Sequence, residues 1–364
     1  MLELPTLRGP DFDRLLLPDS RAHVDEMELG LYTFGDLVAD PRTGRLPAAS
    51  ERMRQMIDMA ILADEAGLDI VGVGEHHGAG FVNSATAVTI AAMARATKQI
   101  RLTSAVTLLS TADPVRTFQE FATADLISDG RVELIFGRGA FTESFPLFGF
   151  DLKDYDALFA EKLGLFAEIN TKSRVTWSGR FRPALHEAEI APRPAQGRLP
   201  VWIGAGSPAS IERAARLGYP LAIPVLGGNF HGYAQLAQHY RHVRSLSGFS
   251  VEDSRIAVFS HLHVTATEAE TREDFYPNYS AYLGPLFRGP MPRKAYDQML
   301  APGGSLVGGD VQQVIDKLMM LREMTGATRY VGQIDIGGQS FSDVAKGIEL
   351  FATKVAPALR KASA

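Results

Sequence analysis

Short apolar runs rich in β-branched residues alternate with longer helix-like segments along most of this chain. Such alternation is typical of βαβ units and a parallel sheet. The predicted strands are Glu28–Phe34, Leu68–Gly74, Arg101–Leu108, Arg131–Phe136, Pro200–Ile203, Leu221–Val225, Arg255–Val264 and Arg329–Ile336. The predicted helices lie near 50–66, 82–97, 114–129, 151–170, 208–217, 230–247, 309–325 and 341–355. Eight strand–helix pairs favour an α/β protein with a closed (β/α)8 TIM barrel, because an open doubly wound sheet usually has only about five or six strands.

Two stretches interrupt this rhythm, and both contain several proline and glycine residues. Residues 171–199 precede the fifth strand, and residues 276–308 separate the seventh from the eighth. Because loops of this length are usually functional or disordered, we expect both to be insertions at the barrel rim, with 276–308 excluding water from the site. Residues 1–26 fit no part of the repeat and form a predicted N-terminal extension. Residues 27–364 are predicted to form a single barrel domain.

Composition and charge exclude several classes of function. A net charge of -5 does not provide the positive charge that nucleic-acid binding needs, so a small molecule is the expected partner. The chain has no cysteine, which excludes disulfides, thiolate nucleophiles and cysteine-ligated metals. The first 26 residues lack a secretory apolar region, and no stretch approaches a membrane span. We therefore expect a cytoplasmic protein without a membrane partner.

Acidic and imidazole side chains follow the second predicted strand, where a barrel carries its chemistry. The residues are Glu75, His76 and His77. Adjacent strand residues point to opposite faces, so the two histidines cannot both face one pocket. One histidine is expected to be structural. The other is either catalytic or a hydrogen-bonded packing residue, and the residues alone leave both interpretations open. His261 and His263 alternate on the seventh strand without an evident third ligand, so no metal site is predicted.

Two further strand ends carry features that suit an anion. Arg138 lies between Gly137 and Gly139 after the fourth strand, where glycine lets a ligand approach the backbone and arginine suits phosphate or carboxylate. A turn with a solvated arginine is the alternative. The segment Gly204–Ser210 after the fifth strand offers a helix start with free amides. It nominally matches a dinucleotide fingerprint, but no acidic residue follows about 20 residues later, which favours one phosphate over a pyrophosphate. In a barrel both motifs could belong to one phosphate site.

Taken together, these residues resemble the bacterial-luciferase-like flavin-dependent monooxygenases, and the pattern is closest to the luciferase alpha chain. The similarity covers nearly everything from Met27 to the end. It rests on the order and spacing of Glu75-His76-His77, Thr111–Arg116, Ser128–Arg131 leading to Gly137–Gly139, Phe148-Gly149, and a tail from Val307 to Leu359.

This resemblance implies a (β/α)8 barrel that uses reduced FMN or, alternatively, coenzyme F420. His76 matches the family's pocket histidine, a base near the flavin during oxygen chemistry. Arg138, Gly139 and Ala140 match a segment that contacts the FMN phosphate and ribityl chain. Gly206, Ser207 and Ser210 match the phosphate site at a helix start. The resemblance also implies a cis peptide between Ala105 and Val106 under the flavin ring.

The chain departs from the luciferase pattern at two positions. Gly137 stands where the luciferase alpha chain has a reactive cysteine, and Asp156 stands where it has a second phosphate-binding arginine. A literal luciferase is therefore not expected. The missing arginine leaves Lys153 or Lys162 as candidate substitutes.

The leading functional hypothesis is a two-component monooxygenase. A separate flavin reductase would supply reduced FMN, which would react with O2 to give a C4a-hydroperoxide that oxygenates a small, apolar organic substrate. Strand-end position predicts pocket walls from Tyr32, Phe34, Phe141, Val225 and Leu226. The alternatives are an F420-dependent hydride-transfer oxidoreductase and a non-catalytic flavin-binding protein. The resemblance also suggests a homodimer packed through the early helices.

Overall fold

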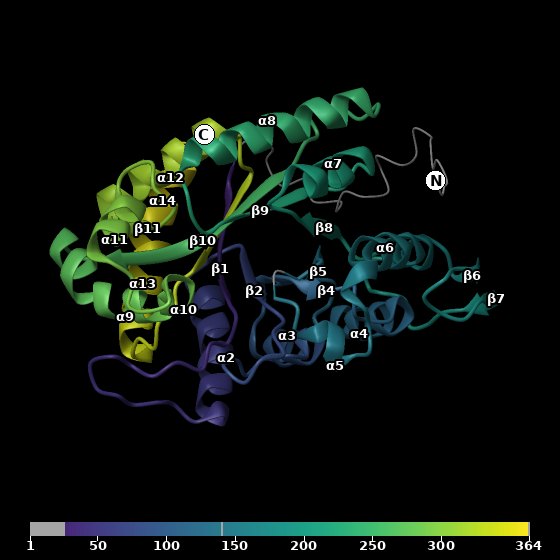
Figure 1. Ribbon diagram of the computed structural model, residues 1–364, viewed down its shortest axis with the longest axis horizontal. Helices are drawn as coiled ribbons and strands as arrows, with labels where there is room; N and C mark the ends of the chain where they lie inside the picture. The colour runs from purple at the N-terminus through teal and green to yellow at the C-terminus, as the bar shows by residue number, and fades with distance from the viewer. Residues whose placement is uncertain (1–25, 140, 363–364) are drawn as a thin grey trace.

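Eight parallel strands close into a barrel in the computed structural model of the chain, which describes residues 26–139 and 141–362 (Figure 1). Around the barrel the strands are β1 (Glu28–Thr33), β2 (Ile70–Val73), β3 (Arg101–Ser104), β5 (Val132–Gly137), β8 (Val201–Gly204), β9 (Leu221–Val225), β10 (Ile256–Thr265) and β12 (Arg329–Gln333). Pairing of β12 with β1 completes the ring. A short strand β4 (Thr107–Leu108) follows β3 and also pairs with β5. The predicted (β/α)8 barrel is confirmed.

The helices cover the outside of this barrel (Figure 1). They are α2 (Ala49–Glu65), α3 (Thr86–Ala96), α4 (Pro114–Ile127), α6 (Tyr155–Thr171), α7 (Pro208–Arg216), α8 (Phe230–Leu246), α12 (Val311–Thr325), α13 (Phe341–Leu350) and α14 (Ala356–Lys361), with a short α5 (Ser144–Leu147) after β5. Side-chain caps define where several of these helices begin. The Asp113 carboxylate accepts from the first amides of α4, and Asp310 forms a capping box with Gln313 at the start of α12.

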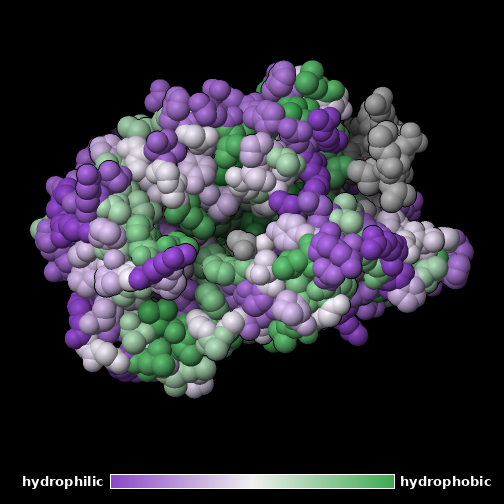
Figure 2. Space-filling view, in the orientation of Figure 1, coloured by the Kyte–Doolittle hydropathy of each residue, from purple (hydrophilic) through white to green (hydrophobic). Residues whose placement is uncertain are grey.

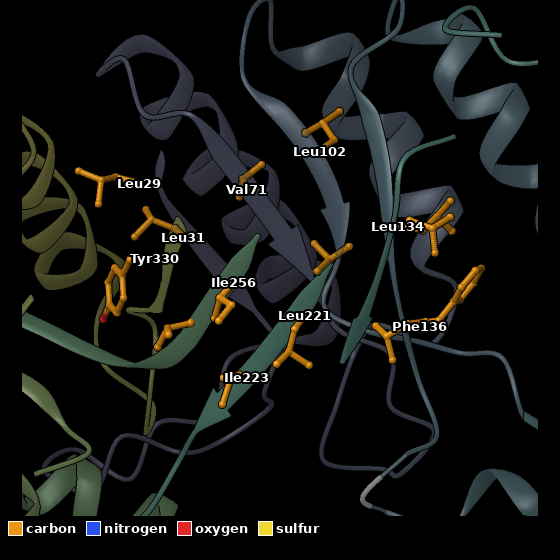
Figure 3. Packing of buried hydrophobic residues seen from close by; sticks show 14 of the residues in the cluster. Leu29, Leu31, Val71, Leu102, Leu134, Phe136, Leu221, Ile223, Ile256 and Tyr330 are labelled. Atoms are coloured by element: carbon orange, nitrogen blue, oxygen red, sulfur yellow. The ribbon is translucent and has the colours of Figure 1, made fainter. Parts of the chain in front are cut away.

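Two apolar layers follow from the alternation of side chains along each strand. One set of strand residues points outward and packs under the helices; Figure 3 shows it from Leu29, Leu31, Val71, Leu102 and Leu134. The other set fills the barrel interior with Tyr32, Ile70, Ala105, Ile135, Trp202, Ala222, Ala257, Phe259 and Val331. The barrel is therefore packed through its centre, and a ligand must approach from one end.

A buried ionic cluster occupies the amino-terminal end of the barrel. The Arg329 guanidinium donates to Glu28 Oε2 at 2.8 Å and to the buried Glu133, and it lies 4.4 Å from the Trp202 ring centre. β12 and β5 lie on opposite sides of the strand order, so the Arg329–Glu133 pair spans the barrel. This end is closed by charge and aromatic packing, which leaves the carboxyl end of the strands for chemistry.

The first predicted insertion, 171–199, contains a folded hairpin that follows α6. Residues Arg174–Trp177 (β6) and Leu185–Glu189 (β7) form an antiparallel hairpin. The hairpin packs against the outside of α6, where the Phe181 amide donates to Glu161 Oε1 at 2.9 Å. Its tip lies near the start of α4 and of α6, where Arg182 pairs with Asp113 at 3.1 Å and Arg180 pairs with Asp154 at 3.0 Å.

The second predicted insertion, 276–308, follows the carboxyl end of β10 and is folded rather than loop-like. It contains α9 (Tyr276–Tyr282), α10 (Gly284–Phe287) and α11 (Arg293–Leu300), and it returns as β11 (Val307–Asp310). β11 pairs in parallel with the last residues of β10, Leu262–Thr265. The segment supplies most of a separate apolar cluster, which consists of Phe275, Tyr279, Leu283, Met291, Tyr296, Leu306 and, from after β12, Ile336.

Residues 1–25 of the predicted extension, Ala140 and residues 363–364 lie outside the described residues. Within 26–139 and 141–362, no helix combines the length and the apolar character needed to cross a membrane.

The buried cluster gives a stability prediction. Arg329→Met should lower the free energy of unfolding by about 3–5 kcal/mol, because Glu133 and Glu28 would keep buried charge with only their 3.4 Å contacts to Arg101 and Arg255. Arg174→Met is the matched control, since its pair with Glu189 at 3.1 Å is exposed and should contribute no more than about 1 kcal/mol. Urea unfolding followed by circular dichroism measures both. Equal midpoints for the two variants would contradict the structural role of Arg329.

Candidate active site

Small residues line one side of the barrel mouth around the Ala105–Val106 peptide. This bond is cis, as predicted. A Cβ on Gly137 would lie 2.4 Å from Val106 Cγ2, and one on Gly204 would lie 3.1 Å from Val106 Cγ1. The valine side chain therefore sits between two glycines, and this packing explains why position 137 has no room for a cysteine. Figure 2 shows the surface hollowed near the centre of the view, with apolar side chains inside the hollow.

His76 lies in an aromatic box just after β2. Its ring stacks on Phe81 with centres 4.0 Å apart, and it meets the edges of Phe34 at 4.9 Å and Phe141 at 5.1 Å. Its Nδ1 lies 3.6 Å from Glu143 Oε1, at the start of α5. Burial lowers the pKa of His76 more than the Glu143 carboxylate raises it. The imidazole is therefore neutral at pH 7 and able to accept a proton.

His77 has different partners, in agreement with the prediction that adjacent histidines face opposite ways. Its Nε2 lies 2.9 Å from Glu75 Oε1, and its ring meets the edge of Phe148 at 5.0 Å. The other carboxylate oxygen of Glu75 accepts from the Leu108 amide at 3.0 Å. This pair ties the end of β2 to β4, so His77 serves the structure around the cis bond.

The two predicted anion motifs meet at one place. Arg138 Nη2 donates to Ser210 Oγ at 2.5 Å, and the Ser210 hydroxyl lies 2.8 Å from that of Ser207 at the start of α7. Gly139 has a positive φ of 86°, and its carbonyl accepts from the Tyr155 hydroxyl at 2.6 Å. The motifs after β5 and β8 therefore lie together, and their role as one phosphate site stays a prediction. Ala140, predicted beside them, lies outside the described residues.

A second arginine, missed in the sequence, completes the cluster. Arg213 stands three residues after Ser210 on α7, a spacing that places both on one helix face. Its Nη2 and Arg138 Nη1 both donate to Asp156 Oδ1, at 2.9 Å and 2.5 Å. Arg213 Nη1 is buried and has no hydrogen-bond partner among the described residues.

The lysines proposed as substitute cations lie elsewhere, so that expectation was wrong. Lys153 pairs with Asp151 at 2.9 Å on the surface. Lys162 is buried, where its ammonium donates to the Ser110 carbonyl at 2.7 Å and lies 3.9 Å from the Phe150 ring centre. Arg213 supplies the second positive charge instead.

Four of the five predicted pocket-wall residues lie near the mouth or inside the barrel. Tyr32 belongs to the interior layer, and Phe34 packs against that layer while reaching His76. Phe141 contacts His76 and is exposed, and Leu226 is also exposed.

Val225 is the exception, and its prediction as a pocket wall was wrong. It is buried in the layer between strands and helices. The alternation along β9 turns Leu221, Ile223 and Val225 outward, so Pro224 faces inward, where it lies 3.3 Å from the Cβ position of Gly206.

Polar side chains line the opposite side of the mouth. Tyr32, Gln333 and His261 are direct neighbours in register on β1, β12 and β10. Gln333 Nε2 donates to Asp36 Oδ2 at 2.9 Å, while Gln333 Oε1 is buried without a partner among the described residues. Burial, and secondly the nearby Asp335 carboxylate, raise the pKa of Asp36 to about 7. This wall can offer hydrogen-bond acceptors to a bound molecule.

His261 and His263 do not converge on a common ligand. His261 Nδ1 shares a 2.7 Å hydrogen bond with the Tyr279 hydroxyl, whereas His263 stacks on Phe275 with ring centres 3.7 Å apart. The described part of the chain contains no group of three or more histidine or acidic side chains arranged to hold a metal ion.

Comparison with known sequences finds one matching family model. It is described as luciferase-like monooxygenase and matches residues 27–329. The oxygenase component of flavin-dependent trigonelline monooxygenase from Acinetobacter baylyi is 24% identical over 360 residues, covering 91% of this chain and 95% of that protein. The alkanal monooxygenase alpha chain of Photorhabdus luminescens is 27% identical over 201 residues, covering 53% of this chain and 56% of that protein. An F420-dependent glucose-6-phosphate dehydrogenase from Amycolatopsis mediterranei is 33% identical over 174 residues, covering 45% and 51%.

Solved structures share the fold. The monooxygenase RslO1 from Streptomyces bottropensis superposes with a TM-score of 0.80 at 22% identity, covering 91% of this chain and 99% of that one. The oxygenating constituent of 3,6-diketocamphane monooxygenase from Pseudomonas putida, in complex with FMN, gives 0.76 at 19% identity, covering 91% and 98%.

The packing of Val106 against two glycines gives a second prediction. Gly137→Ala should lower the thermal midpoint, because the new Cβ would lie 2.4 Å from Val106 Cγ2, closer than real Cβ contacts allow. Adding Val106→Ala should restore most of the loss, a coupling that a double-mutant cycle measures. Gly227→Ala is the control, since a Cβ there meets nothing within 4 Å. Strictly additive effects of the first two changes would contradict the packing.

Proposed function

The chain belongs to the luciferase-like monooxygenase family, and on this premise we propose that it is the oxygenase of a two-component, FMN-dependent monooxygenase. The carrying observation is the cluster of Arg138, Ser210 and Arg213 at the start of α7. It offers two guanidinium groups, a helix amino terminus and one buried donor without a partner, a set of groups that suits a single phosphate. FMN carries one terminal phosphate. The residues of the site therefore fit this cofactor.

The other predicted site residues would contact the ring and the phosphate of the flavin. The small residues on one side of the mouth leave space for a planar ring over Ala105 and Val106. When bound, reduced FMN would supply the electrons that activate O2 at flavin C4a. Arg138, Ser207, Ser210 and Arg213 would hold the phosphate, and Gly139 and Gly206 would let the backbone approach it.

His76 is the proposed proton-transfer residue. If its Nδ1–H donates to Glu143, the Nε2 lone pair is free to take a proton from a reacting group. Glu143 would then be a positioning residue that fixes the tautomer and the ring orientation. The surrounding Phe34, Phe81 and Phe141 keep water away from the imidazole.

A small organic substrate would bind beside the flavin, between the aromatic residues near His76 and the polar wall of Asp36 and Gln333. The α9–α11 insertion follows β10 at this end of the barrel and would exclude water. Gln333 Oε1 favours a substrate that carries at least one hydrogen-bond donor on a largely apolar body.

Two partner proteins are part of the proposal. A separate flavin reductase is supported by the relative named as an oxygenase component. A homodimer packed through the early helices is supported by the exposed Val88 and Leu126 on α3 and α4.

The second candidate is F420-dependent hydride transfer, which F420-dependent relatives over about half of the chain favour. Anaerobic titration of the purified protein with reduced FMN and with reduced F420, followed by flavin spectroscopy, separates the two. We expect saturable binding of reduced FMN, weaker binding of F420, and a protein-dependent oxidation time course after mixing with oxygen. Tighter binding of F420, or no binding of reduced FMN, would overturn the proposal.

The His76–Glu143 pair gives a pH prediction. The carboxylate raises the pKa of His76 against the lowering effect of burial. Glu143→Gln should therefore move the titration of His76 to lower pH, observed by NMR of labelled histidine, and shift the acidic limb of the pH–rate profile the same way. Glu189→Gln, on the exposed hairpin, is the control and should change neither. An unchanged His76 titration in Glu143→Gln would exclude the positioning role.

A further inference from the structure

Asp156 pairs with both arginines of the cluster proposed to hold the flavin phosphate. One oxygen, Oδ1, accepts from both Arg138 Nη1 and Arg213 Nη2. Arg138 is held from its other side by Ser210, and its guanidinium lies 4.8 Å from the Tyr155 ring centre. The arginines are thus oriented toward a common acceptor that comes from α6, an element different from those that carry them.

The carboxylate is an incomplete partner for this pair. Two guanidinium groups carry two positive charges, and a single carboxylate balances one. Arg213 Nη1 remains buried and unpartnered among the described residues while Asp156 is in place. A phosphate has about −1.5 to −2 charge at pH 7 and three acceptor oxygens, so it could satisfy both arginines and the serine hydroxyls together.

Asp156 is also the most exposed of the three charged side chains in the cluster. Its side chain is 67% exposed, whereas those of Arg138 and Arg213 are 22% and 24% exposed. It stands in the first turn of α6, where a negative charge is favourable even without the arginines. Rotation of this side chain into water therefore leaves the arginines in place and the helix start intact.

We propose that Asp156 is an internal competitor for the flavin phosphate, which keeps the arginines oriented in the free protein and is displaced when the flavin binds. This inference rests on the proposed FMN site. Hydrogen bonding with Arg213, chiefly, lowers the pKa of Asp156, so the carboxylate stays ionised at neutral pH and opposes the phosphate electrostatically. The consequence is weaker, more readily reversible binding of phosphate-bearing flavins, which suits a protein that receives its flavin from another enzyme in each cycle.

The test compares FMN with riboflavin, which lacks the phosphate. Affinities of wild type, Asp156→Asn and Asp156→Ala are measured anaerobically for both reduced flavins by fluorescence quenching. Because exposed ion pairs contribute modestly, we expect both variants to bind FMN roughly three- to tenfold more tightly, with riboflavin affinity unchanged. Inorganic phosphate should also compete with FMN more effectively in the variants than in wild type.

Two controls accompany the test. Asp154→Asn removes a neighbouring carboxylate that pairs with Arg180 at 3.0 Å, and it should leave both affinities unchanged. Arg213→Met should weaken FMN binding and not riboflavin binding. Thermal midpoints confirm that each variant is folded.

The outcomes separate this inference from the function on which it rests. FMN affinity that is equal or weaker in Asp156→Asn and Asp156→Ala, with wild type binding FMN, would overturn the competitor role alone and make Asp156 a support for the arginines. A parallel gain for riboflavin would also overturn it, because the effect would not act through the phosphate. Absence of FMN binding in wild type would overturn both proposals.

Discussion

The Arg329–Glu133 ion pair crosses the barrel from β12 to β5, and the geometry of the other end depends on it. Glu28 joins the same guanidinium from β1, and Trp202 stacks against it from β8. Because these contacts connect strands on opposite sides, they fix the cross-section of the barrel as well as its closure. Removing Arg329 would leave Glu133 and Glu28 with only their longer contacts to Arg101 and Arg255, so the stability of the cluster depends on this one guanidinium.

The two sides of the barrel mouth, at the carboxyl ends of the strands, differ in the size and polarity of their side chains. On one side, glycines and alanine surround the Val106 side chain and leave room for a flat molecule. On the other side, Tyr32, Gln333 and His261 form a continuous polar and aromatic row across three neighbouring strands. His76 lies in its aromatic box, where Phe34 contacts both His76 and Tyr32. Under the proposed function, the cofactor, the proton-transfer group and the substrate would each contact a different wall of the same barrel end.

The strands, the outer helices and the meeting of the two anion motifs could be predicted because each depends on local pattern and on strand order. The cis bond at Ala105–Val106 came from resemblance alone. Val225 was wrongly predicted as a pocket wall because the prediction considered only its place at the end of β9. The alternation of side chains along the strand turns Pro224, and not Val225, inward. Arg213 and Glu143 were missed because their role depends on helices whose orientation is set by tertiary packing. The hairpin at 174–189 had too little apolar periodicity to distinguish it from a loop.

The α9–α11 segment leaves the barrel at β10 and returns beside it, because β11 pairs with the last residues of β10. Its entry and exit thus lie roughly 5 Å apart, the spacing of paired strands. It also has an apolar cluster largely its own, and hydrogen bonds such as Tyr279 with His261 and Tyr282 with Asp36 attach it to the barrel. A segment with adjoining ends and internal packing can be lengthened, shortened or exchanged at little cost to the scaffold. Descendants of this barrel could therefore acquire new substrates by replacing one contiguous stretch of gene, while the Arg138–Arg213 cluster and the buried ion pairs of Arg329 stay unchanged.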